Sequence, residues 1–248
     1  MTDARASGGF GAPARTLVGY ACRVGFLDEL KDQARTLQTS TAAADDETLA
    51  RNRRLANGAC QLAHEYWKEL CEQLNLIRSP SKARYVIGGR QPVENLVCGN
   101  FRVLPQMQTL PGGASRYETL ILAWQASNGR LERIEKELPK DVERMRATLI
   151  QAGIQAHETS VRDPSSGRVL ATAFEFQCTV AASVRVTPLP DSGKVRLTFT
   201  NIDQLERVEA EYPAAGLRQR LLDEIGRWIV GQPQRVLQYA AGLKRYQH

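Results

Sequence analysis

Residues 168–187 read RVLATAFEFQCTVAASVRVT, and this stretch decides the fold that the sequence predicts. Its even positions are mostly apolar, namely Leu170, Thr172, Phe174, Phe176, Cys178, Val180, Ala182, Val184 and Val186. The odd positions are mostly polar from Glu175 onward, so the pattern repeats every two residues, as in a β-strand with one apolar face. At about 3.3 Å per residue the strand would extend about 55 Å, which predicts a long, bent or bulged strand. Such a strand belongs in an antiparallel sheet with one face in solvent.

Further strands are predicted on both sides of this stretch. The main strands are 95–110, 117–125, 154–162, 168–187 and 194–211. The last three form a meander, because the Pro- and Gly-containing segments between them are typical of turns. Pro111, Gly112 and Gly113 predict a turn across which the first two strands pair. Leu205 breaks the alternation in the last strand, which indicates a bulge there.

Two long helices are expected to pack on this sheet. The first is predicted from Gly129 to Ala152 and ends at Gly153; at Pro139 it either kinks or divides into two helices. Its apolar stripe consists of Leu131, Ile134, Leu138, Val142, Met145 and Leu149. The second follows Pro213, with a further helical piece over 236–243. An apolar helix that follows an antiparallel meander normally packs on the apolar face of the sheet.

The N-terminal part of the chain is predicted to be helical. Leu27, Leu30, Ala34 and Leu37 lie at helical spacing in a short helix that residues 39–41, Thr-Ser-Thr, should interrupt. A longer helix is expected from about Asp45 to the residues before Pro80. Its apolar seam is Leu49, Ala56, Cys60, Ala63, Trp67, Leu70, Leu74 and Ile77. Alternating steps of three and four residues are typical of a coiled coil or a helical hairpin.

These elements predict an α+β fold: a coiled-coil-like helical arm, then an antiparallel meander packed with two long helices. The expected divisions of the 248-residue chain are a disordered N-terminus over 1–18, the helical arm over 19–80 and the sheet domain over 81–248. A helix of about 33 residues is about 50 Å long and needs a partner for its apolar stripe. That partner is either the sheet domain or another copy of the chain.

Composition limits the possible classes of protein. The net charge is +6, which permits contact with nucleic acid or an anionic surface but does not require it. The five cysteines are odd in number and far apart, so we expect no disulfide framework and a cytoplasmic location. No run of about 18 apolar residues predicts a membrane span, and no signal peptide is recognisable at the N-terminus.

No pattern of residues predicts a particular chemistry. Cys60, His64 and Cys71 share a broad helical face, but they supply three metal ligands at most and belong to an apolar seam, so we expect packing there. Cys98 and Cys178 have no partner in sequence that marks a nucleophile. We therefore assign no catalytic, cofactor-binding or metal-binding residues, and we favour a non-enzymatic role while leaving an unfamiliar activity open.

Three hypotheses about function follow from the sequence. The first is an interaction or assembly protein, in which the helical arm mediates self-association or binds a protein partner. The second is a carrier of an apolar small molecule in a cavity lined by Phe174, Phe176, Val180, Phe199 and Trp228. The third is a nucleic-acid-associated protein that uses Arg51, Arg53, Arg54, Lys82, Arg84, Tyr85 and Arg90.

Overall fold

The structure is a computed structural model that describes residues 26–89 and 91–246. The chain divides into two units, residues 1–45 and residues 46–248, which are described separately below. The N-terminus predicted to be disordered, residues 1–18, and Arg90 lie outside the described residues. Among the described residues, no helix is both long enough and apolar enough to cross a membrane.

The N-terminal helix α1 extends from Phe26 to Ile77. The prediction that it breaks at residues 39–41 is therefore wrong. Thr36 and Thr39 donate their hydroxyl hydrogen bonds to the carbonyl oxygens of Asp32 and Arg35, each at 2.8 Å, so the threonines bond to the preceding turn. Such bonds allow a threonine to remain inside a helix. The helix ends before Ser79 and Pro80, as the sequence predicts.

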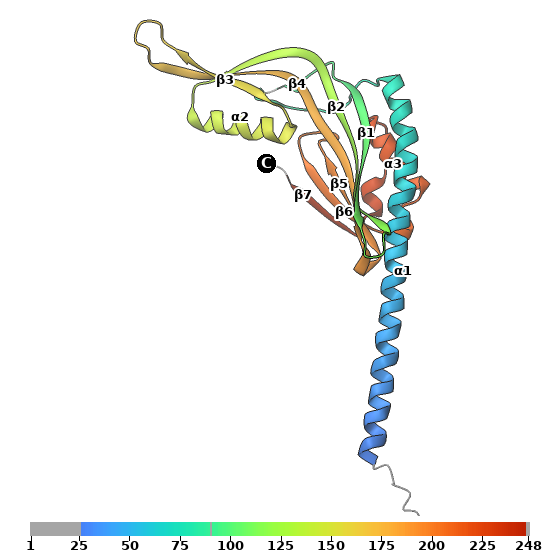
Figure 1. Cartoon of the computed structure of the whole chain (residues 1–248). Coiled ribbons are helices and arrows are strands. Elements are labelled where there is room, and N and C mark those ends of the chain that lie inside the picture. Colours follow the sequence, from blue (N-terminus) through green and yellow to red (C-terminus); the bar gives the residue numbers. More distant parts are fainter. Residues whose placement is uncertain (1–25, 90, 247–248) are drawn as a thin grey trace, which may run out of the picture. The chain divides into compact units, whose positions relative to one another are not determined.

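Residues 97–246 contain an antiparallel sheet, which confirms the α+β fold (Figure 1). Its strands are β1 (Val97–Thr109), β2 (Ser115–Lys136), β3 (Ala156–Arg162), β4 (Val169–Leu189), β5 (Lys194–Thr200), β6 (Arg207–Pro213) and β7 (Gly242–Tyr246). They pair in the order β1-β2-β4-β5-β6-β7, and β3 pairs with the first part of β4. One edge of β4 therefore holds β2, whereas the other edge holds β3 and then β5.

Strand β4 has the two faces that the sequence predicts from Phe174 onward, but the prediction is wrong at the start of the strand, where Leu170 is exposed, Thr172 is half-buried, and Ala171 and Ala173 are buried. From Phe174 to Val186 every even-numbered side chain is buried, whereas the odd positions from Glu175 onward are half-buried or exposed. Phe199 pairs with Val184 and Leu197 pairs with Val186, so β5 continues the same apolar face. This face is part of the hydrophobic core of the unit.

The prediction of a helix over residues 129–152 is wrong for residues 129–136. Residues up to Lys136 belong to β2, and α2 (Pro139–Ala152) begins with Pro139 in its first turn, where a proline is favourable. Leu131 and Ile134 fit a helical stripe by spacing, but in the structure they pair with residues of β4. Gly129 adopts a φ of +69° in a bulge of β2, and Gly153 ends α2 in the left-handed region as predicted.

The C-terminal region also differs from its prediction. Helix α3 (Gln219–Ile229) is present, but it has 11 residues and is shorter than expected. Residues 236–243 were predicted to be helical; the structure has a short 3₁₀ helix, Val236–Tyr239, and then β7, which pairs with β6. The expected bulge at Leu205 is instead a turn between β5 and the separate strand β6.

The part of α1 within the larger unit packs on that unit through the predicted seam. Five seam residues are buried, namely Ala56, Cys60, Ala63, Trp67 and Leu74. Leu49 and Leu70 are half-buried, and Ile77 is exposed. Helix α3 contacts the same part of α1, because the Tyr66 hydroxyl donates a 2.7 Å hydrogen bond to Asp223. On its other side α3 packs Trp228 against Phe199 of β5.

Candidate functional site

The residues predicted to line an apolar cavity are core residues. All five are buried, with exposed fractions from 0% for Phe174 and Val180 to 5% for Trp228. The ring centroids of Phe199 and Trp228 are 4.7 Å apart, so these two side chains fill space against each other. Phe176 lies in the wall of a pocket described below. The hypothesis of an apolar-ligand carrier stays a prediction.

Among the described residues predicted to bind nucleic acid, Arg53 and Arg54 line one groove, and Lys82, Arg84 and Tyr85 do not line it. Lys82 and Arg84 are exposed, but Tyr85 between them is only 1% exposed. Its hydroxyl donates a 2.5 Å hydrogen bond to the carbonyl oxygen of Asn201, and burial raises the pKa of Tyr85. Because the ring is enclosed, it is not available to stack on a base. Arg51 is exposed on α1.

Arg53 and Arg54 lie in the wall of a groove, which we call the arginine groove. It has a volume of about 580 Å³. Its walls come from α1, the β1–β2 hairpin and the β4–β5 turn, and the lining residues are Arg53, Arg54, Ala56, Asn57, Gln108, Leu110, Ser115, Arg116, Tyr117, Glu118, Thr187, Pro188 and Pro190. Two of the predicted basic residues thus line the same groove as a third arginine, Arg116, that sequence reasoning missed.

Two asparagines of α1 hold the walls of the groove together. The Asn57 side-chain oxygen accepts a 3.0 Å hydrogen bond from the backbone N–H of Tyr117, which fixes α1 to β2. The Asn52 side chain donates a 3.4 Å hydrogen bond to the carbonyl oxygen of Asp191, in the turn between β4 and β5. The groove is therefore built from three segments that already contact one another.

Tyr117 connects the groove to the predicted Cys60, His64 and Cys71 constellation. Its hydroxyl lies 2.9 Å from His64 Nδ1, and burial raises its pKa. Cys60 and Cys71 are buried, and burial raises their thiol pKa values to about 12 and about 11. A thiol must lose its proton to bind a metal, so burial disfavours metal binding here. No cluster of potential metal ligands occurs among the described residues.

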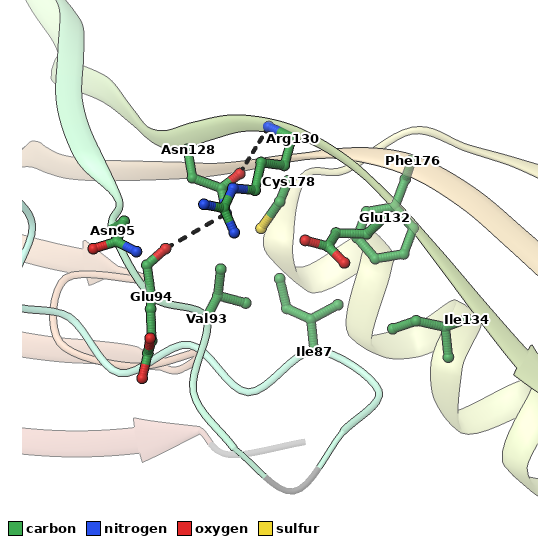
Figure 2. Close-up of a pocket in the computed structure, with 10 residues that line it drawn as sticks. All are labelled: Ile87, Val93, Glu94, Asn95, Asn128, Arg130, Glu132, Ile134, Phe176 and Cys178. Carbon is green, nitrogen blue, oxygen red and sulfur yellow. Dashed lines mark hydrogen bonds between the residues drawn. The ribbon is translucent and has the colours of Figure 1, made fainter.

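A second, smaller pocket lies beside the bulge of β2, and we call it the bulge pocket (Figure 2). It has a volume of about 200 Å³ and is lined by Ile87, Val93, Glu94, Asn95, Asn128, Arg130, Glu132, Ile134, Phe176 and Cys178. The Asn128 side chain shapes its entrance, because it accepts a hydrogen bond from the N–H of Arg130 at 3.0 Å and donates one to the Glu94 carbonyl at 3.5 Å.

One carboxylate lies beside the apolar face of the sheet, just after the bulge of β2. Glu132 pairs with the buried Phe176 of β4, and Figure 2 shows its carboxylate and the Cys178 sulfur facing the same space. Burial, and secondly the charge of Glu132, raise the pKa of the Cys178 thiol to about 11. Burial also raises the pKa of Cys98. Both thiols stay protonated near neutral pH, which makes them poor nucleophiles.

The sequence offered little signal for either cavity. Arg116 and Pro188 are far from Arg53 in the chain, and only the pairing of β2 with β4 and the packing of α1 bring them to one groove. The bulge between Ser127 and Leu131 adds two residues to β2, so Glu132 lies on the same face as the buried Leu120, Leu122 and Trp124. The helix predicted over 129–152 gave no indication of this position. Comparisons with models of protein families, with curated proteins and with solved structures found no match for this chain.

Proposed function

We propose that this chain is an interaction and assembly protein, and that the N-terminal part of α1 pairs with the same part of a second copy. The observation that carries the proposal is the exposure of Leu27 and Leu30, at 63% and 43%. Leu37, one heptad after Leu30, is 67% exposed. Every described side chain from 27 to 45 is exposed.

The spacing of these residues favours another helix as the partner. Leu27, Leu30, Ala34 and Leu37 follow the three- and four-residue steps of a coiled-coil seam. The residues beside the seam carry both signs of charge, Glu29 and Asp32 against Lys31 and Arg35. A stripe with mixed charges beside it is self-complementary, since acidic positions of one helix can face basic positions of another. This argues for a second copy rather than a strongly acidic or basic partner.

The later part of α1 supports the same proposal by contrast. The seam from Ala56 to Leu74 is covered by the sheet and α3, so its apolar surface is not available to a partner. Transfer of apolar surface out of water contributes roughly 25 cal/mol per Å². Leu27 and Leu30 have exposed apolar surface that association would bury.

The test is the oligomeric state of the purified chain, measured by light scattering after size exclusion and by native mass spectrometry. We expect a species at twice the 27.6 kDa chain mass, in a concentration-dependent equilibrium with single chains. The double variant Leu27→Ser, Leu30→Ser should shift this equilibrium to the single chain.

The matched control is Leu76→Ser, because Leu76 is 79% exposed on the same helix but lies outside this stripe. It should leave the association unchanged. A wild-type chain that stays single at all concentrations contradicts the proposal. Equal dissociation of the Leu76 variant would also contradict it, because association would then follow general surface hydrophobicity and not this stripe.

A further inference from the structure

The arginine groove gathers positive charge that its own walls do not neutralise. Arg53 and Arg54 of α1 are exposed, and Arg116 of β2 is half-buried. Glu118 is the one carboxylate that lines the groove. Within residues 26–89 and 91–246, none of these four side chains forms an ion pair. The lining therefore has an excess of two positive charges.

One of the three guanidinium groups is already oriented by the fold. Arg116 donates two hydrogen bonds to the Gln108 side-chain oxygen, from Nε at 2.9 Å and from Nη2 at 2.6 Å. Both residues belong to the β1–β2 hairpin and pair with each other across it. This fixes the plane of the guanidinium and leaves its other N–H donors for a ligand. A donor that is fixed before binding loses less conformational entropy on binding.

The remainder of the groove is largely apolar. Ala56, Leu110, Pro188 and Pro190 line it, together with the half-buried ring of Tyr117. The Tyr117 hydroxyl is engaged with His64, so the ring is held in place. A groove with guanidinium groups and an apolar wall recognises a molecule that has an anionic group and an apolar part.

We propose that the arginine groove binds a phosphate monoester that carries an aromatic or other apolar group. A phosphate offers several oxygens to guanidinium forks, which bind it through paired charge-assisted hydrogen bonds. The two excess positive charges match the charge of a monoester near neutral pH, about −1.5 to −2. The volume of about 580 Å³ falls within the usual range for small-molecule pockets, roughly 300–1,000 Å³.

The arrangement favours a small phosphorylated molecule over a nucleic-acid strand. A strand binds along a basic path with aromatic side chains on which successive bases stack. Here three arginines line one compact groove, and Glu118 in the same groove would repel a continuing phosphate backbone. Lys82 and Arg84 do not line the groove, and Tyr85 is buried.

The test uses the full-length chain and three probes in isothermal titration calorimetry: phenyl phosphate, inorganic phosphate and phenol. Phenyl phosphate should bind at least about tenfold more tightly than either of the other two, because it alone engages both parts of the groove. The double variant Arg53→Gln, Arg54→Gln should weaken phenyl phosphate binding by about tenfold or more, and Arg116→Gln should weaken it similarly.

The control is the double variant Lys140→Gln, Arg168→Gln, which removes the same charge from two exposed residues that do not line the groove. It should leave binding unchanged, and thermal unfolding of all variants should show that they fold. Loss of binding in the control would mean that net charge governs binding, which overturns the proposal. Equal binding of inorganic phosphate, or binding of an oligothymidylate strand without binding of phenyl phosphate, would overturn it as well.

Discussion

The two parts of α1 have similar apolar spacing but different surroundings. In residues 56–74 the seam consists of the small side chains Ala56, Cys60 and Ala63, followed by Trp67, and it is buried against the sheet unit. In residues 27–37 the stripe is rich in leucine and exposed. Small residues let a helix backbone approach a sheet closely, whereas leucines at coiled-coil spacing suit another helix. Spacing predicts that a helix has an apolar face, and residue size indicates what covers it.

The largest expected effect comes from Trp67, which is fully buried at the centre of the packed part. Replacement of Trp67 by Ala should lower the free energy of unfolding by about 3–5 kcal/mol, because it leaves a cavity between α1 and the sheet. The matched change in the exposed part, Leu30→Ala, should lower the free energy of unfolding of the single chain by less than about 0.5 kcal/mol. Urea unfolding followed by circular dichroism measures both values. Similar costs at the two positions would contradict the comparison.

A second variant at the same position separates size from polarity. Among the described residues the Trp67 Nε1–H has no hydrogen-bond acceptor, although it is buried. An unpaired buried donor lowers stability by roughly 1–3 kcal/mol. Trp67→Phe removes this donor but keeps most of the ring, so it should cost much less than Trp67→Ala. Equal destabilisation of the two variants would mean that the indole N–H donates a hydrogen bond in the folded chain.

The contrast also shows which parts of the fold the sequence could predict. The alternation in β4 predicts the buried face correctly from Phe174 to Val186, where one face is apolar throughout, but not at Leu170 and Thr172. The same reasoning failed over residues 129–136, where Leu131 and Ile134 fit a helical stripe. The bulge at Gly129 and the pairing with β4 decided that segment, and neither is visible in local spacing.

The candidate sites were less predictable than the fold. The sequence indicates Arg53 and Arg54 as nucleic-acid contacts by their charge alone. It also predicts that Tyr85 stacks on a base, whereas the structure encloses this side chain. A basic residue can lie on any solvent-exposed helix face, so its charge alone does not predict a binding site. Only tertiary packing decides whether other basic residues lie near it. Arg116 lines the same groove as Arg53, and Asn57 bonds α1 to the backbone of the adjacent Tyr117. Nothing in the sequence near Arg116 indicates this arrangement.

An intermediate effect is expected at Asn75, near the C-terminal end of α1. Its side chain accepts a 2.8 Å hydrogen bond from the N–H of Phe101 and donates one of 2.9 Å to the carbonyl oxygen of the same residue. Asn75→Ala leaves both backbone groups without this partner and should cost about 1–2 kcal/mol. The exposed neighbour Gln73→Ala should cost less than about 0.5 kcal/mol. Equal losses would mean that the amide bonds contribute nothing to the attachment of α1 to β1.

The smallest effect is expected at Asn52, near the start of the packed part. Its one hydrogen bond, to the Asp191 carbonyl, is long at 3.4 Å, so Asn52→Ala should cost about 0.5 kcal/mol or less. The same side chain lies over Gly193, where φ is +63° and an added Cβ would stand 2.7 Å from the Asn52 oxygen. Gly193→Ala alone should therefore be destabilised both by backbone strain and by this contact.

The Asn52→Ala, Gly193→Ala double variant should be more stable than Gly193→Ala alone, because the close contact with Asn52 is removed. It should still lose about 1–2 kcal/mol to the backbone strain of an alanine in the left-handed region. A double-mutant cycle in urea unfolding measures this coupling. A coupling of zero would mean that Asn52 does not rest on the β4–β5 turn. The packed part of α1 would then begin closer to Ala56, and Arg53 would lose the support that holds it at the groove.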